Sequence, residues 1–201
     1  MKPVVLDIMK YKILIVFFLV SIVASLAQTK QERELRIAED ELPENVLQHL
    51  KDYITSAKRL RFYKEQDGTK SSYEVKFKKD KLHYSVEFDE NGTLEDVEFI
   101  IKPTDIPEDT YLSITAYLNK TFKKPRVKKI QQQYLAKDGT HKNVLKNAFQ
   151  NLLIQQLNYE LIISSKDDSG FNEYELTFNA EGKHLLTRKA VKSKYDHVLY
   201  P

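Results

Sequence analysis

The residues best suited to do chemistry are histidines and acidic pairs, but their spacing does not assemble a site. The five histidines never fall three or four residues apart, the spacing that would place two metal ligands on one face of a helix: His49, His83, His141, His184 and His197. Acidic pairs such as Asp89-Glu90 and Asp167-Asp168 stand in turn-like segments, where carboxylates commonly accept hydrogen bonds from backbone N–H groups. Phosphate-binding loops, nucleophile elbows and zinc-protease motifs are absent from the sequence. We therefore predict no catalytic residue, no metal ligand and no cofactor.

Polar and aromatic residues on one face of a predicted sheet are the better candidates, and the chemistry they suggest is binding. Strict alternation over residues 58–65, 71–79 and 82–88 puts apolar side chains on one face and polar ones on the other. A face that mixes both charges with an aromatic side chain is compatible with protein binding, and equally with an ordinary solvated sheet. The candidate binding residues are Arg59, Arg61, Tyr63, Glu74, Lys76, His83 and Glu87.

The elements that must position this face are expected twice along the chain. Leu42-Pro43-Glu44 and Ile106-Pro107-Glu108 each open an amphipathic helix with proline in its first turn, where the missing N–H costs no hydrogen bond. Strand signals separated by short turns follow each helix, and residues 84–92 are echoed by residues 174–182. Duplication is the interpretation we adopt, with chance similarity of half-buried strands as the alternative.

The predicted fold is therefore α+β, with two tandem units that each pack one helix on a four-stranded antiparallel sheet. The first unit spans 42–102 and the second 103–201, after an N-terminal linker at 28–41. Residues 140–153 predict an additional amphipathic helix inserted in the second unit. We expect the repeated aromatics to be structural and to face the helix of their own unit: Tyr84, Phe88, Tyr174 and Phe178.

The first 27 residues predict export. Lys10 and Lys12 precede an apolar run over residues 13–24, and Ser25-Leu26-Ala27 supplies small residues for cleavage before Gln28. The apolar run is shorter than a membrane span requires, so we expect no stable membrane insertion after cleavage. Translation from either Met1 or Met9 is compatible with this signal.

Composition narrows the class of protein further. The sequence contains no cysteine, which excludes disulfides, thiolate catalysis and cysteine zinc sites. The part that follows the signal is close to electrically neutral, and this argues against a dedicated nucleic-acid-binding protein.

The order of motifs resembles the PepSY-like domains of exported bacterial proteins. The resemblance rests on the Leu42-Pro43 helix start, the Tyr73-Glu74-Val75 strand and the turn at residues 88–92, with looser matches over 106–191. Tandem units of this shape are also similar to the beta-lactamase-inhibitory-protein architecture, in which a concave sheet surface grips a partner protein. That resemblance implies a bacterial envelope location and binding through a sheet face. No binding residue is carried over from it.

These observations lead us to expect a non-enzymatic binding module, periplasmic or secreted, that uses its sheet faces or the groove between units. An envelope or extracellular protein is the expected kind of partner, while its identity and the oligomeric state stay open. The alternatives are an exported hydrolase whose site assembles from residues distant in sequence, and a structural envelope protein without a discrete ligand.

Overall fold

The computed structural model describes residues 29–30, 32–136, 140–167 and 170–190, and the predicted signal peptide lies outside them. Most of the described chain is strand. The strands are β1 (Thr29–Lys30), β2 (Glu32–Ile37), β3 (Lys58–Asp67), β4 (Lys70–Lys79), β5 (Leu82–Asp89), β6 (Leu94–Ile100), β7 (Arg126–Leu135), β8 (Leu157–Asp167), β9 (Gly170–Asn179) and β10 (His184–Ala190). The helices are α2 (Glu44–Ile54), α3 (Glu108–Thr121) and α4 (His141–Phe149), and short 3-10 turns at Glu39–Glu41 and Pro103–Asp105 precede α2 and α3.

All ten strands belong to one sheet in the order β1-β10-β9-β8-β7-β6-β5-β4-β3-β2. From β2 to β10 every neighbouring pair is antiparallel, and only the two-residue β1 pairs in parallel, with β10. The prediction of two units with separate four-stranded sheets is therefore wrong. At the expected boundary β6 and β7 pair directly, through contacts such as Val97 opposite Tyr134. Joining them satisfies backbone groups that two separate sheets would leave unpaired at their edges.

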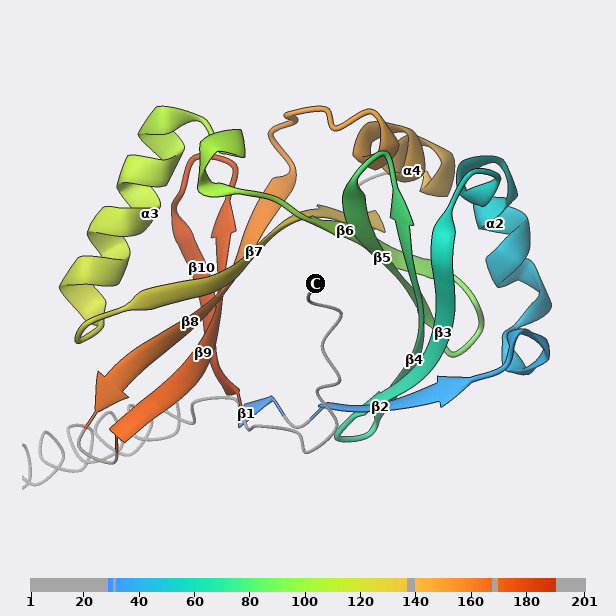
Figure 1. The fold of residues 1–201 in the computed structure, drawn as a ribbon, viewed down its shortest axis with the longest axis horizontal. Helices are drawn as coiled ribbons and strands as arrows, with labels where there is room; N and C mark the ends of the chain where they lie inside the picture. The colour runs from blue at the N-terminus through green and yellow to red at the C-terminus, as the bar shows by residue number, and fades with distance from the viewer. Residues whose placement is uncertain (1–28, 31, 137–139, 168–169, 191–201) are drawn as a thin grey trace, which may run out of the picture.

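The sheet curves so strongly that its helices lie outside it and its other face is turned inward (Figure 1). The convex face is apolar, and its strands bury Val75, Val86, Phe99, Leu161 and Leu176 beneath the helices. From α2, Val46 and Leu50 are fully buried, and from α3 Ile114 is. Alternation along the strands therefore places polar residues on the concave face.

Helix α4 ties the two halves of the chain together. It follows β7 in sequence, yet Phe149 at its end stacks on Tyr84 of β5 at 4.9 Å and on Tyr53 of α2 at 4.5 Å between ring centroids. Tyr84 was expected to face α2 and lies against Phe149 of α4 instead. The other repeated aromatics do pack against their own half: Phe88 stacks on His49 of α2, Phe178 meets Tyr117 of α3, and Tyr174 meets Phe122 just after α3. The helix predicted near 140–153 is present, and it ends at Phe149.

Two glycine turns fasten α2 and α3 to the sheet. Asp89 accepts hydrogen bonds from the backbone N–H groups of residues 91 and 93, and Asn179 accepts from those of residues 181 and 183. Both turns contain a glycine with positive φ, Gly92 at 74° and Gly182 at 77°. Asn45 of α2 donates to the carbonyl of Gly92, and Ser113 of α3 donates to that of Gly182. The two halves therefore share this detail, although duplication itself stays a prediction.

The segment expected as a linker, 28–41, contributes strands to the sheet. β2 pairs with β3 along its whole length, and β1 pairs with β10, so consecutive strands of the chain occupy the two opposite ends of the strand order (Figure 1). The alternation of Leu35 and Ile37 with Glu34 and Arg36 accounts for β2. Within the described ranges, none of the helices combines the length and apolar character needed for a membrane span.

Candidate functional site on the concave face

Six of the seven candidate binding residues lie on the concave face, as alternation predicts. Cross-strand register places Arg61 opposite Lys76, Tyr63 opposite Glu74, and Glu74 opposite Glu87. His83 belongs to the same face, opposite Lys78. Arg59 departs from the pattern because the β3–β4 register shifts between Lys58 and Arg61, and Arg59 itself has φ of 60°. The shared face is established, and binding there stays a prediction.

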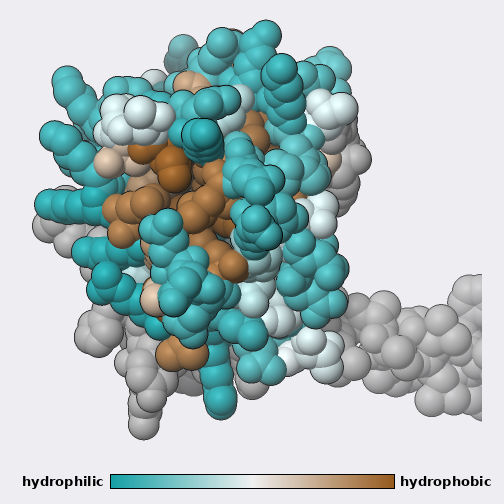
Figure 2. All heavy atoms as spheres, turned by 90° about the vertical axis from the view of Figure 1, so that its right-hand side faces the viewer, coloured by the Kyte–Doolittle hydropathy of each residue, from teal (hydrophilic) through white to brown (hydrophobic). Residues whose placement is uncertain are grey.

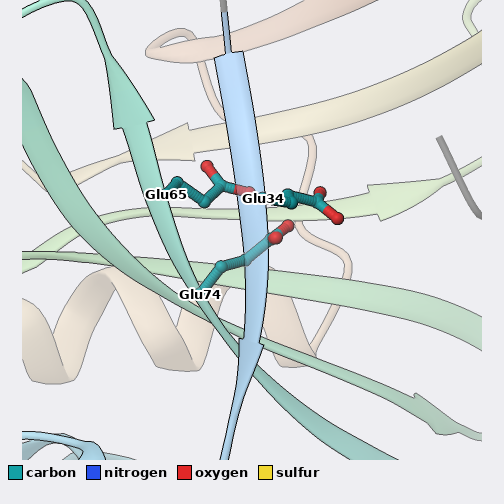
Figure 3. Close-up of side chains that lie close together, drawn as sticks. All are labelled: Glu34, Glu65 and Glu74. Carbon is teal, nitrogen blue, oxygen red and sulfur yellow. The ribbon is translucent and has the colours of Figure 1, made fainter. Parts of the chain in front are cut away.

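Three glutamates from adjacent strands converge at one end of this face. Glu34 of β2, Glu65 of β3 and Glu74 of β4 bring carboxylate oxygens within 4.8 Å of one another (Figure 3). The ammonium group of Lys76 lies among them, 2.7 Å from Glu74 Oε2 and paired also with Glu34. It lies 4.9 Å from the centre of the Tyr63 ring, so three of the candidate residues do meet here. Oxygen ligands of this kind suit a hard cation, and the lysine supplies the positive charge instead.

The acidic and basic side chains of this cluster stabilise one another's charged forms. Burial is the largest influence on Glu74 and disfavours its ionised form, but the Lys76 ammonium and hydrogen bonds from Glu65, Lys76 and Ser85 together outweigh burial and lower the pKa of Glu74. Burial likewise opposes the charge of Lys76, and the carboxylates of Glu74 and Glu34 overcome it and raise the lysine pKa. Ser85 donates a further hydrogen bond to Glu74. The cluster is therefore a structural ion-pair network in its present form.

A row of acidic residues crosses the middle of the face. Glu74 stands directly opposite Glu87, and Glu87 stands directly opposite Asp96. Glu98 and Glu160 continue the acidic surface onto β6 and β8, and both are buried. Like charges directly opposite in a sheet are destabilising, and here the ammonium of Lys76 compensates Glu74 while Asp96 takes up a proton.

Amide side chains organise the acidic groups at the centre. Gln133 donates from Nε2 to Asp96 Oδ2 at 3.1 Å and to Glu98 Oε1 at 2.8 Å. Gln131 donates from Nε2 to Glu98 Oε2 at 2.5 Å, and Asn158 donates to Gln133 Oε1 at 3.2 Å. Burial together with the nearby Glu160 raises the pKa of Asp96 to about 8, and the same two causes raise that of Glu98 well above its usual range. The centre therefore carries protons at neutral pH.

Arg188 supplies a cation at the other side of the concave face. Arg188 of β10 pairs with Glu175 of β9, and its Nη1 lies 3.9 Å from Asp67 Oδ2 at the end of β3. β10 and β3 are each next to one end of the strand order, so Arg188 connects strands from opposite sides of the curved sheet.

Sequence reasoning missed the central and far-side residues, although part of the signal was available. Val97, Phe99 and Ile101 alternate in the sequence as the apolar face of a strand does, and that pattern implies that Asp96 and Glu98 point the other way. The missed residues are Asp96, Glu98, Gln131, Gln133, Asn158, Glu160, Glu175 and Arg188.

A second candidate region lies on the outer side of the molecule. Figure 2 shows apolar side chains gathered on the side formed by α2 and its neighbouring strands. A shallow groove there is lined by Leu47, Ile54 and Leu60, with Glu39, Gln48 and Lys51 at its borders. Apolar grooves of this kind can receive a partner, but no titratable cluster accompanies this one.

Solved structures with a similar fold come from Bacteroides. A DUF2874 family protein from Bacteroides uniformis ATCC 8492 matches 77% of this chain and 94% of its own, with a TM-score of 0.52 and 15% identity. A protein described as periplasmic, from Bacteroides eggerthii DSM 20697, matches 77% of this chain and 93% of its own, with a TM-score of 0.51 and 13% identity. A BLIP-like protein from Bacteroides fragilis NCTC 9343 covers 78% and 93% with a TM-score of 0.47 and 14% identity.

These likenesses concern the fold alone. The two neighbours with a TM-score above 0.50 are described as a DUF2874 family protein and a periplasmic protein, and neither is described as a PepSY protein. No protein-family model matches the chain, and no curated protein does either.

Proposed function

We propose that this protein is an exported binding module whose concave sheet face takes a lysine- or arginine-bearing segment of another envelope or extracellular protein. Export is supported by the signal pattern of residues 1–27 and by the periplasmic description of a neighbour with the same fold. The partner segment is expected to be cationic because the face that would receive it is rich in acidic residues.

The observation that carries the proposal is the row Glu74, Glu87 and Asp96, placed directly opposite one another on three strands. Burial and the neighbouring acids raise the pKa of Asp96 to about 8, so full ionisation of the row is unfavourable without an added cation. A cationic partner would stabilise the ionised acids, because charge complementarity across an interface gives specificity and speeds association. The buried charged residues of this face are all acidic, whereas its cations Arg61, Lys76, Lys78 and Arg188 are half-buried. The buried acids are Glu65, Glu74, Asp96, Glu98, Glu160 and Glu175.

A polypeptide segment fits the extent of this surface better than a small ion does. The acidic residues run from β3 across to β9, and neighbouring strands are spaced about 4.8 Å apart. A polypeptide with several cationic side chains can contact carboxylates across several strands, whereas a single small ion contacts one cluster.

Titration calorimetry with hexalysine and, for comparison, hexaglutamate tests the proposal. We expect hexalysine alone to bind, with an affinity that falls as salt is added. The double variant Glu87→Gln/Glu160→Gln should weaken binding by roughly tenfold. The matched variant Glu90→Gln/Glu108→Gln, which changes exposed acids outside the concave face, should bind as the native protein does.

Equal affinities in the two double variants would contradict the assignment of the concave face.

A further inference from the structure

A basic surface lies at one side of the molecule, where the C-terminal end of α3 meets the start of β7 and the adjoining ends of β8 and β9 (Figure 1). The carbonyl of Lys123 accepts hydrogen bonds from Ser165 Oγ and from the backbone N–H of Lys166, each at 3.0 Å. These bonds hold the loop after α3 against the end of β8. Five exposed basic residues gather at this junction: Lys123, Lys124, Arg126, Lys128 and Lys166.

An exposed aromatic ring stands among these cations. Phe171 of β9 lies directly opposite Lys166 in the β8–β9 register, and the guanidinium of Arg126 lies 5.5 Å from the centre of its ring. The ring is still 52% exposed. An uncovered phenyl group costs free energy in water that contact with an apolar phase would recover. The basic surface therefore combines positive charge with an apolar side chain.

Neither local acids nor protection of a strand edge accounts for this combination. Asp167 Oδ2 accepts from Asn172 and lies 3.9 Å from Lys189 Nζ, so its charge is already engaged. Lysine does protect exposed strand edges from aggregation, and the start of β7 extends past β6, which pairs with residues 131–135. Edge protection explains a lysine on the strand. It does not explain the lysines in the loop before β7, or the exposed phenyl ring.

We propose that the basic surface, together with Phe171, docks the protein reversibly on an anionic phospholipid bilayer. Lipid phosphates pair with the ammonium and guanidinium groups, while the phenyl ring enters the boundary between headgroups and acyl chains. An anionic polymer would satisfy the charges and leave the ring in water, so a bilayer fits both features. Such contact lies on the membrane and needs no spanning segment. The surface is opposite in charge to the acidic row, so docking does not rest on the proposed function.

Vesicle co-sedimentation tests the docking surface. The mature chain from Gln28 is used, because the apolar run of the signal would itself enter a bilayer. It should bind vesicles of equal parts phosphatidylglycerol and phosphatidylcholine, bind pure phosphatidylcholine far less, and dissociate as salt is added. Lys123→Gln/Lys124→Gln should lower the partition coefficient by roughly tenfold or more, since each cation near an anionic bilayer contributes about fivefold. Lys142→Gln/Lys146→Gln, the same charge change on exposed residues of α4, should leave it unchanged.

Tryptophan fluorescence tests whether the ring reaches the bilayer. The chain contains no tryptophan, so Phe171→Trp and Leu112→Trp each introduce a single reporter at an exposed position, the second on α3. Emission from Phe171→Trp should shift to the blue on anionic vesicles and be quenched by bromine-labelled acyl chains. Leu112→Trp should show neither effect. Heparin, a polyanion without an apolar phase, should shift the emission of neither variant.

Each contrary result overturns the proposal in a different way. Equal partition of the two lysine double variants would show that the basic surface does not dock the protein. Equal quenching of the two tryptophan variants would show that the ring of Phe171 does not lead into the bilayer. Heparin binding as tight as vesicle binding, with no quenching of Phe171→Trp, would replace the bilayer by an anionic polysaccharide. Hexalysine binding enters none of these results, so the two proposals fail separately.

Discussion

Asp96 lies among carboxylates that cannot all be charged at once. Its folded-state pKa of about 8 is above the usual value of 3.8, so between these two pH values the folded protein holds a proton that the unfolded chain has lost. Stability from this group is therefore fully present below the unfolded pKa and is lost as pH rises through the folded one.

Asp96→Asn should remove this pH dependence. Asparagine imitates the protonated form and can still accept from Gln133, so we expect it to raise the free energy of unfolding by about 1–3 kcal/mol above pH 8 and to change little near pH 4. Urea denaturation at a series of pH values measures the difference. A variant that loses stability at high pH would show that ionised Asp96 has a compensating partner.

Lys76 stabilises the fold, because its ammonium group compensates the charge of the buried Glu74 carboxylate. Lys76→Met should leave Glu74 buried without its cation and lower the free energy of unfolding by about 3 kcal/mol at neutral pH. The pKa of Glu74 is lowered in the folded state, so this contribution is present above the usual glutamate pKa and is lost as pH falls through the folded value. The penalty of the variant should accordingly shrink in acid.

Chemical denaturation of Lys76→Met at neutral and acidic pH, beside Lys78→Met two residues along the same strand, checks this assignment. Lys78→Met should stay within about 0.5 kcal/mol of the native protein. Equal effects of the two variants at neutral pH would mean that Glu74 does not depend on Lys76.

At the scale of elements, the glycine turns decide how the helices sit on the sheet. A Cβ atom at Gly182 would lie 2.6 Å from the backbone oxygen of Thr110 in α3, and that oxygen cannot move without the helix. Gly182→Ala should therefore cost about 3 kcal/mol or more, since a steric clash is added to the strain of positive φ. Gly68→Ala, at φ of 61° with nothing within 4 Å of the added Cβ, should cost only about 1 kcal/mol.

Gly92 provides an intermediate case. Its added Cβ would meet the side chain of Asn45, which can swing away but would give up its hydrogen bonds to the turn. Thermal unfolding of the three alanine variants should rank Gly182 above Gly92 and Gly92 above Gly68. A different order would show that α3 adjusts to the turn more readily than its contacts suggest.

At the scale of the whole molecule, the continuous sheet predicts one cooperative unfolding transition. β6 pairs with β7, and Phe149 carries α4 across to Tyr84 and Tyr53, so neither half keeps its core when the other is lost. Hydrogen exchange measured by mass spectrometry at increasing urea should give coincident midpoints for peptides from β4–β5 and from β8–β9. Separate midpoints would mean that the two halves behave as independent domains after all.

Phe149→Ala sharpens this test. The ring comes from the second half of the chain and stacks on Tyr53, Phe77 and Tyr84 of the first, so its loss should cost about 3–4 kcal/mol and shift both midpoints together. A shift confined to one half would contradict the role of α4 as a tie between them.

The amino-acid sequence by itself determined the local structure. Alternation in residues 71–79 and 82–88 placed Glu74 and Glu87 on one face, and proline before Glu44 and Glu108 marked the starts of α2 and α3. These features follow from neighbours a few residues apart, because side-chain period and turn chemistry are local properties of the chain. For the same reason six of the candidate residues were assigned to the correct face.

Only the tertiary structure decided how far the sheet continues and which polar residues meet. The pairing of β6 with β7, the packing of Phe149 on Tyr84, and the approach of Arg188 to Asp67 join residues that are distant in the chain. The periodicity of the sequence does not predict such contacts, since they depend on strand register and on the curvature of the whole sheet. The acidic centre at Asp96, Glu98 and Gln131 exists for that reason: three ordinary surface-type residues become a buried cluster when β6 and β7 pair inside one curved sheet.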